Sequence, residues 1–381
     1  MNTPYIQSEH QILRESVRKF LNKEAKPYFD TWEKNRIVPR DFWIKMGEQG
    51  FLCPWLEESY GGIEADFAYS VVLVEELERM GTGLMGISLH SDVCVPYIYH
   101  YGNEEQKKKW LPGCTSGKLI TAVAMTEPGT GSDLANIKTT AILDGDHYVV
   151  NGQKTFISNG IHSDLIILVC KTDPHAVPAH AGISLLVVEA DTPGFSRGRK
   201  LDKIGLHSQD TAELMFDDCR VPKANLLGIE GSGFKYLMEK LQPERLLATL
   251  MAQVSAEDAL EMTLAYVKTR TAFGKPLSKQ QHIQFKMADL ATEVSIGRTY
   301  IDDLIVKHMQ GVDVVTQVSM AKAWITEMAK RVTGECLQLH GGYGYMEEYP
   351  IARRYRDIPV SAIYAGTNEI MKMIIAKNLG L

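Results

Sequence analysis

Apolar residues recur at helical spacing in the first part of the chain. From Ser8 onward they fall three or four positions apart, and Ser8 with Gln11 forms a capping box at the start of a predicted helix. A second helix is predicted from Asp66 to Gly81, where the glycine suits a left-handed C-terminal cap. We therefore expect residues 1–118 to form an all-helical domain.

The pattern changes in residues 119–231. Five short segments there are rich in β-branched residues and bounded by turns: KLITAVAMTE, HYVVNGQKTFIS, DLIILVCKTD, GISLLVVEAD and TAELMFDDCRV. Within the second segment, Asn151-Gly152 predicts a two-residue hairpin turn. Because no long helical pattern separates these segments, an antiparallel β-domain of the barrel or sandwich kind fits better than a parallel sheet.

Long helical patterns return in residues 232–381. Three run over residues 243–270, 278–310 and 313–339, and a short last helix begins near Thr367, its predicted N-cap. Long antiparallel helices with short links imply a helix bundle. The predicted fold is thus α+β, with an N-terminal helical domain, a middle antiparallel β-domain and a C-terminal bundle.

Composition narrows the class of protein. The 381 residues are 45% hydrophobic and 23% charged with a net charge of -6, which disfavours nucleic acid as a partner. The longest apolar runs fall short of the ~20 residues needed to span a membrane. Glu9 and Glu15 in the first twenty residues argue against a signal or transit peptide, so we expect a cytoplasmic location. Six scattered cysteines without C-x-x-C spacing predict buried, reduced thiols and no metal site.

Four motifs each have a plain structural interpretation. In MTEPGTGSDL, Leu134 replaces the third glycine of a dinucleotide fingerprint and no helix follows, so a turn is favoured, although such a loop can offer N–H groups to a cofactor. LHGGYGY ends a helix, with close approach to a phosphate as the alternative, and its His340 alone is more often packed than a ligand. Arg270 in RTAFGKP is either a helix-end cation or a partner for a pyrophosphate.

LQPERLL is the fourth motif. It puts Pro243 at the predicted first position of a helix and Glu244 in its first turn, where a glutamate usually complements the helix dipole. The same interpretation applies to Glu369.

Together the motifs are more specific than any one of them. MTEPGTGSD, NGQKTFISNG, RTAFGKPLSKQQ, LQLHGGYGY and YAGTNEI, in this order, resemble the acyl-CoA dehydrogenase family over essentially the whole chain. The resemblance implies a flavoprotein that binds FAD and an acyl-CoA, removes the α and β hydrogens, and passes electrons to electron-transferring flavoprotein. It also implies a homotetramer, because the cofactor is shared between neighbouring subunits.

The same resemblance implies the cofactor residues. Phe156 stands where many relatives have tryptophan and Ser158 where many have threonine, and both changes keep the aromatic wall and the hydroxyl. The residues expected along the flavin are Met125, Thr126, Gly131, Ser132, Phe156, Ile157 and Ser158, and the cofactor is also expected to contact Thr367, Asn368 and Glu369. Those expected to reach the FAD of a neighbouring subunit are Arg270, Phe273, Gln281, Gln338, Leu339, His340, Gly341 and Gly342.

The resemblance also raises the question of the catalytic base. In the best-known branches the α-proton is taken by a glutamate at the position of Ala365, which cannot accept a proton. Long-chain and isovaleryl-type relatives instead carry a Glu-Arg pair on a helix, and PERL supplies Glu244-Arg245. Glu244 is thus the expected base, and Ala365 keeps an N–H for the thioester oxygen. The residues expected along the substrate are Ser132, Lys235, Gln242, Arg245, Ala365 and Gly366.

Several alternatives stay open at this point. FKYLMEKLQPERL and LQLHGGYGYMEEYPIARRY resemble the long-chain-type branch of the family, but they do not determine the length of the acyl chain. Medium or long chains are the expected substrates, with a short branched, isovaleryl-like substrate as the alternative. A CoA-linked reductase, an oxidase that uses O₂, and a non-catalytic acyl-CoA-binding paralogue are the other candidates.

Overall fold

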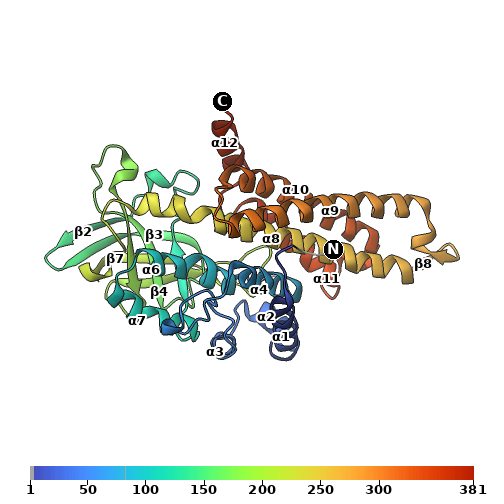
Figure 1. Cartoon of the computed structure of the whole chain (residues 1–381), viewed down its shortest axis with the longest axis horizontal. Helices are drawn as coiled ribbons and strands as arrows, with labels where there is room; N and C mark the ends of the chain where they lie inside the picture. Colours follow the sequence, from blue (N-terminus) through green and yellow to red (C-terminus); the bar gives the residue numbers. More distant parts are fainter. Residues whose placement is uncertain (1–3, 82) are drawn as a thin grey trace.

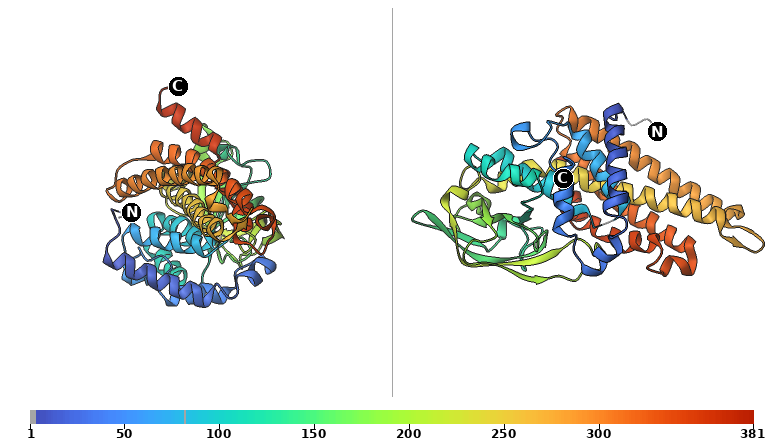
Figure 2. Two further views of the ribbon diagram at one scale, coloured as in Figure 1. Left: turned by 90° about the vertical axis from the view of Figure 1, so that its right-hand side faces the viewer. Right: turned by 90° about the horizontal axis from the view of Figure 1, so that it is seen from below.

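The structure is a computed structural model that describes residues 4–81 and 83–381. The β-domain lies at one end, the first helices of the N-terminal domain lie near the middle, and a long helical bundle extends to the β8 hairpin at the other end (Figure 1). Viewed from below, the N-terminal helices lie between the β-domain and the bundle (Figure 2). The predicted plan of helical, β and helical parts is confirmed.

The N-terminal domain is all-helical, as predicted. Its elements are α1 (Ser8–Glu24), α2 (Phe29–Asn35), α3 (Arg40–Glu48), α4 (Phe67–Met80), α5 (Met85–Ser88), the π-helix η2 (Leu89–Cys94), α6 (Val95–Tyr101) and α7 (Glu104–Thr115). Two predicted caps are wrong in detail. The capping box at α1 joins Gln7 to His10 rather than Ser8 to Gln11, because Gln7 is the last extended residue. Gly81 has φ 163°, which is extended, and glycine is required there because a Cβ would lie 2.6 Å from Cζ of Phe29.

The β-domain holds seven strands of one sheet. They are β1 (Thr121–Ala124), β2 (Thr140–Asp144), β3 (His147–Ser158), β4 (Leu165–Lys171), β5 (Ile183–Glu189), β6 (Phe195–Lys200) and β7 (Thr211–Pro222). The strand order is β1-β4-β2-β3-β7-β6, and β5 pairs with β4. The prediction of a wholly antiparallel sheet is wrong for β4, which pairs in parallel with β1 over Leu165–Leu168 and with β2 at Lys171, and antiparallel with β5. Both faces of β4 are buried, which explains its continuous apolar run.

The predicted hairpin at Asn151-Gly152 is also wrong. The chain turns at Gly145, between Asp144 and His147, and Asn151-Gly152 lies inside β3. Gly152 marks a register shift against β7 and lies close to Thr139, since a Cβ would lie 2.4 Å from the Oγ1 of Thr139 and 2.8 Å from its Cα. The Asn151-Gly152 pair therefore forms a β-bulge rather than a hairpin turn.

The C-terminal bundle contains α8 (Gly233–Thr269), α9 (Gln281–Met309), α10 (Val315–His340), α11 (Pro350–Asp357) and α12 (Asn368–Asn378). A short hairpin of β8 (Thr271–Ala272) and β9 (Lys275–Pro276) links α8 to α9. The predicted N-cap of α12 is confirmed, because the Thr367 side chain accepts a hydrogen bond from the N–H of Ile370. Sequence analysis did not predict α11.

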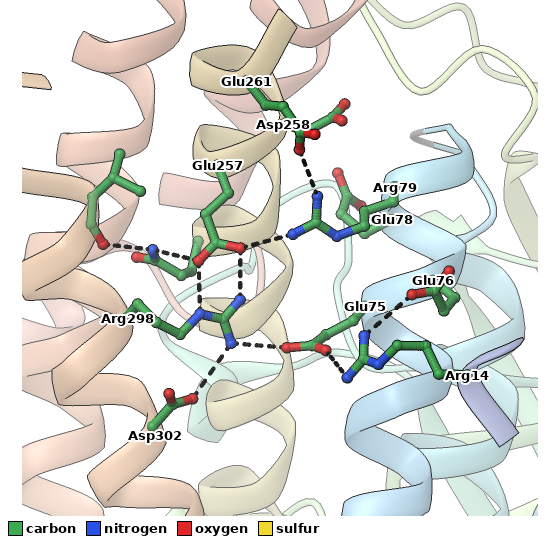
Figure 3. A network of polar contacts seen from close by, with 12 residues as sticks. Arg14, Glu75, Glu76, Glu78, Arg79, Glu257, Asp258, Glu261, Arg298 and Asp302 are labelled. Atoms are coloured by element: carbon green, nitrogen blue, oxygen red, sulfur yellow. Dashed lines mark hydrogen bonds and ion pairs between the residues drawn. The ribbon is translucent and has the colours of Figure 1, made fainter. Parts of the chain in front are cut away.

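A network of ion pairs joins the N-terminal domain to the bundle (Figure 3). Arg298 of α9 contacts Glu257 of α8 at 2.6 Å and Glu75 of α4 at 2.8 Å, and Glu75 also contacts Arg14 of α1 at 2.7 Å. Arg79 of α4 contacts the other oxygen of Glu257. Shared carboxylates that satisfy several guanidinium groups make such a buried network cohesive. It holds α4 firmly against α8, the helix that carries Glu244.

Two further findings bear on the expectations above. All six cysteines are buried free thiols. Across residues 4–81 and 83–381, no helix combines the length and apolar character needed to cross a membrane.

Candidate active site

Glu244 lies in the interior of a long helix. The prediction that Pro243 occupies the first helical position is wrong, because α8 begins at Gly233 and runs through Pro243. A proline inside a helix removes one backbone hydrogen bond, and the packing of α8 in the bundle tolerates that loss. Glu244 therefore lies about three turns into the helix. It cannot be explained as a first-turn residue that complements the helix dipole.

The carboxyl group of Glu244 is buried and poorly satisfied. Its Oε2 atom makes no hydrogen bond with any residue that the structure describes. Burial raises the pKa of this carboxyl to about 7, against the opposing charge of Arg245. Burial, with a smaller contribution from the Glu244 charge, also raises the pKa of Cys94 and of Tyr97, so η2 and α6 lie within reach of that charge. A buried, unpartnered carboxyl is costly for stability and typical of a functional group.

Arg245 connects this part of α8 to the loop before α12. Its Nε donates to the carbonyl oxygen of Ala365 at 3.2 Å, across 120 residues of chain. Ala365 has φ 54° and Gly366 has φ 89°, so two consecutive residues are left-handed. The loop position that lacks a glutamate, Ala365, and the Glu244-Arg245 pair are far apart in sequence. The structure brings them into contact through Arg245.

The loop from Met125 to Ser132 is held by a buried ion pair. Lys154 of β3 is fully buried and contacts Glu127 at 2.8 Å and the carbonyl oxygen of Met125 at 2.9 Å. The N–H of Glu127 and the carbonyl of Thr130 close a tight turn at 2.9 Å. A Cβ on Gly129 or Gly131 would meet no atom within 4 Å. The backbone at Gly129 in the turn and at Gly131 just after it is therefore open to a ligand.

Phe156 presents its ring to solvent near the end of β3. It has φ 59° and its side chain is 68% exposed, at a register shift between Lys154 and Ile157. The adjacent Ile157 packs into the core of the β-domain instead. The bulge therefore turns an aromatic ring outward from a buried strand, which is an expensive arrangement without a partner.

A second predicted cluster lies at the far end of the bundle. Arg270 and the stretch from Gln338 to Gly342 line an open pocket of about 680 Å³, together with Tyr266, Leu277, His282, Ile283, Tyr343 and Met346. The guanidinium of Arg270 lies over the Tyr343 ring at 5.4 Å. His340 is packed, as its sequence context suggested: its Nδ1 contacts the carbonyl of Cys336 at 2.8 Å. Phe273, on the β8–β9 hairpin, is 96% exposed, and Gln281 is exposed at the start of α9.

A single chain does not bring the two clusters together. Glu244 lies on α8 and Arg270 directly follows the end of this helix, 26 residues later, which corresponds to ~39 Å along the helix axis. The β-domain and the β8 hairpin lie at opposite ends of the molecule (Figure 1).

The other predicted residues are engaged in local contacts. Lys235 is exposed and lies 3.8 Å from Glu239, whereas the Gln242 side chain bonds to His308 and to the N–H of Val314. Asn368 is buried and bonds to Thr326 and Lys322, and Glu369 is exposed in the first turn of α12. Ser132 is exposed and Ser158 is half-buried at the end of β3.

Lys322, Tyr97 and Tyr266 were not predicted as site residues, and no motif marks them, because each is an ordinary helical residue until the helices pack. Tyr343 of the pocket, by contrast, lies within LHGGYGY, which could have indicated it.

Family models now identify the class of protein. The chain matches the Acyl-CoA dehydrogenase N-terminal domain over residues 7–118, the middle domain over 122–219 and the C-terminal domain over 231–380. The chain belongs to the acyl-CoA dehydrogenase family, whose members are FAD-dependent oxidoreductases.

Individual relatives agree with this family. The long-chain specific acyl-CoA dehydrogenase of Sus scrofa mitochondria is 48% identical over 98% of this chain and 86% of its own length. The acryloyl-CoA reductase (NADH) of Anaerotignum propionicum is 38% identical over 97% of this chain and 94% of its own. Among solved structures, an acyl-CoA dehydrogenase from Geobacillus kaustophilus has 66% identity and a TM-score of 0.99, with 99% of this chain and 100% of that chain covered.

Proposed function

We propose that this enzyme dehydrogenates an acyl-CoA thioester to the trans-2-enoyl-CoA, with Glu244 as the base that takes the α-proton. The observation that carries the proposal is the unpartnered, buried Oε2 of Glu244 on the helix that also contacts the Ala365 loop through Arg245. Medium or long acyl chains are the proposed substrates, in keeping with the similarity to a long-chain specific relative.

The geometry suits the removal of a weakly acidic proton. A pKa of about 7 makes Glu244 a stronger base than an ordinary carboxylate while leaving about half of it ionised at neutral pH. Negative charge that develops on the thioester oxygen needs donors, and the N–H of Ala365 makes no bond within the described residues. Arg245 links the proposed base to the loop with the N–H donor, because it follows Glu244 on α8 and donates to the Ala365 carbonyl.

The residues present also fit FAD. The open backbone at Gly129 and Gly131 and the outward ring of Phe156 offer a surface for a flat, polar ring system. FAD, when bound, accepts the β-hydrogen together with its electron pair. The chain's own contribution is to hold the α-proton acceptor on helix α8 and the N–H donor for the thioester oxygen in the loop before α12.

We further propose that the cofactor lies between subunits of a homotetramer. In support, the open pocket with Arg270 lies ~39 Å along α8 from Glu244, too far for one chain to complete a single site. The exposed Phe273 beside that pocket would be covered by a neighbouring subunit. Electron-transferring flavoprotein is the proposed electron acceptor, by resemblance to the family.

A CoA-linked reductase is the second candidate, because the acryloyl-CoA reductase of Anaerotignum propionicum is 38% identical. Acceptor assays separate the two. A dehydrogenase reduces electron-transferring flavoprotein after reaction with acyl-CoA, whereas a reductase oxidises a reduced donor in the presence of enoyl-CoA.

The test is an anaerobic titration of the purified yellow protein with straight-chain acyl-CoAs from C4 to C18 and with branched acyl-CoAs. We expect the flavin absorbance to bleach, most rapidly with a medium or long chain. Glu244→Gln should bind FAD and acyl-CoA but fail to bleach. Near-normal bleaching by that variant would redirect the assignment of the base to Glu369, and bleaching by no acyl-CoA would contradict the proposed function itself.

A further inference from the structure

Lys322 is a buried cation that no motif predicted. It lies on α10 with its side chain fully buried, and its Nζ donates to the carbonyl oxygen of Gly366 at 2.6 Å and to Oδ1 of Asn368 at 3.2 Å. Among the described residues it forms no ion pair with a carboxylate. Burying an ammonium group on neutral acceptors is costly, so this arrangement needs a reason.

Its acceptor belongs to the left-handed turn of the active-site loop. Lys322 holds the carbonyl of Gly366, and Arg245 holds the carbonyl of Ala365. In a trans peptide the carbonyl and the N–H point in opposite directions. The N–H groups of Gly366 and Thr367 therefore point away from the two cations. Together with the N–H of Ala365, they have no hydrogen-bond acceptor in residues 4–81 and 83–381.

Three consecutive free N–H groups in a left-handed turn form a concave site for negative charge. A non-glycine residue in the left-handed region is strained by ~1–2 kcal/mol, so Ala365 adopts this conformation only while its surroundings hold it. Arg245 and Lys322 hold the loop in this conformation by donating hydrogen bonds to its carbonyl oxygens. They also add positive charge close to the donors, where low dielectric makes it effective.

We propose that Lys322 is a positioning residue for the reaction, which holds the Gly366 carbonyl so that the N–H groups of residues 365–367 face the thioester oxygen. This inference rests on the proposed function, because it concerns the same site. Lys322 does not contact the reacting carbons. It acts through the loop. The loop stabilises the negative charge that develops on the thioester oxygen when Glu244 takes the proton.

A purely structural role is the competing explanation. Lys322 and Asn368 tie α10 to the start of α12, so the lysine could simply anchor the last helix. The two roles differ in what they change. Loss of an anchor lowers stability and the affinity for every ligand, whereas loss of donor alignment lowers the rate of the step that builds negative charge.

Lys322→Met keeps the length of the side chain and removes the charge and the donors. The matched control is Lys307→Met on α9, where a half-buried lysine pairs with Asp303 at 2.6 Å. Both variants are compared with the wild type as flavin-loaded protein, in the affinity for the enoyl-CoA product by calorimetry, the melting temperature, and the rate of flavin bleaching by stopped flow.

We expect Lys322→Met to lower the bleaching rate and kcat by roughly 10- to 100-fold, the scale of a misplaced or lost donor, while KM and the enoyl-CoA affinity change by less than about threefold. The control should match the wild type in every measurement. A folded, flavin-loaded Lys322→Met that bleaches at the wild-type rate would overturn the inference. So would a variant that loses affinity and rate in equal proportion.

Lys322→Gln keeps a polar group in the same cavity and serves if the methionine variant does not accumulate. The results that would support or overturn the inference are the same for this variant as for Lys322→Met. The proposed function is judged separately on the wild type: failure of the wild type to bleach with any acyl-CoA contradicts both ideas, whereas normal bleaching by both lysine variants contradicts only the role of Lys322.

Discussion

Glu244→Gln should make the folded chain more stable at alkaline pH while it removes the proposed chemistry. The reason is the cost of a buried carboxylate whose Oε2 has no partner within the described residues. Glutamine has nearly the same shape and carries no charge, so it avoids the cost of desolvating an ion. Function and stability therefore oppose each other at this position.

The magnitude follows from the pKa of Glu244, which burial raises from an ordinary value of 4.5 to about 7. Between these values folding takes up a proton, so the wild type loses stability as the pH rises through this window. A difference of about 2.5 in pKa at ~1.4 kcal/mol each amounts to ~3 kcal/mol above pH 7. The glutamine variant lacks this titration, so its advantage is near zero below pH 4.5 and complete above pH 7.

The assay is the melting temperature of wild type, Glu244→Gln and Glu261→Gln at pH 5 and pH 8. Glu261 is the control, because it is an exposed glutamate on the same helix. With an unfolding entropy of ~2.1 cal/mol/K per residue, ~3 kcal/mol corresponds to a rise of about 4 °C at pH 8. The same variant should bleach at least ~100-fold more slowly with acyl-CoA. Equal gains at pH 5 and pH 8, or a destabilised variant at pH 8, would refute the reasoning.

Three further predictions concern other parts of the site. Glu127→Gln leaves the buried Lys154 without its charge partner and should cost ~3–5 kcal/mol of stability, measurable as a lower denaturation midpoint, and an unchanged midpoint would contradict this. Arg270→Gln should weaken FAD binding by roughly 10- to 100-fold in a fluorescence titration, as expected for a lost charge-assisted hydrogen bond, while the exposed Lys279→Gln should have no effect. Ala365→Glu, with Glu244 intact, should crowd the site and slow bleaching, and a faster enzyme on the same substrates would be the contrary result.

Local pattern predicted the outline of the fold well. Long apolar periodicity predicted the N-terminal helices and the bundle, and the N-cap at Thr367 was correct because a cap depends on its own residue and the next few. The hairpin at Asn151-Gly152 was wrong for the opposite reason. Whether an Asn-Gly pair turns the chain or bulges a strand depends on the partner strand, here β7, which lies about sixty residues later in sequence.

For the site, the sequence indicated which residue types are available, and the structure showed how they are placed. The sequence by itself determined that Ala365 cannot be the base and that Glu244-Arg245 was available, because those facts depend on residue type. Only the tertiary structure decided that Glu244 lies deep in α8 without a hydrogen-bond partner for Oε2 within the described residues, and that Arg245 and Lys322 meet the carbonyls of one left-handed turn. Burial and backbone contacts arise when helices far apart in sequence pack together. A residue such as Lys322 therefore carries no local signal of the carbonyl that it holds.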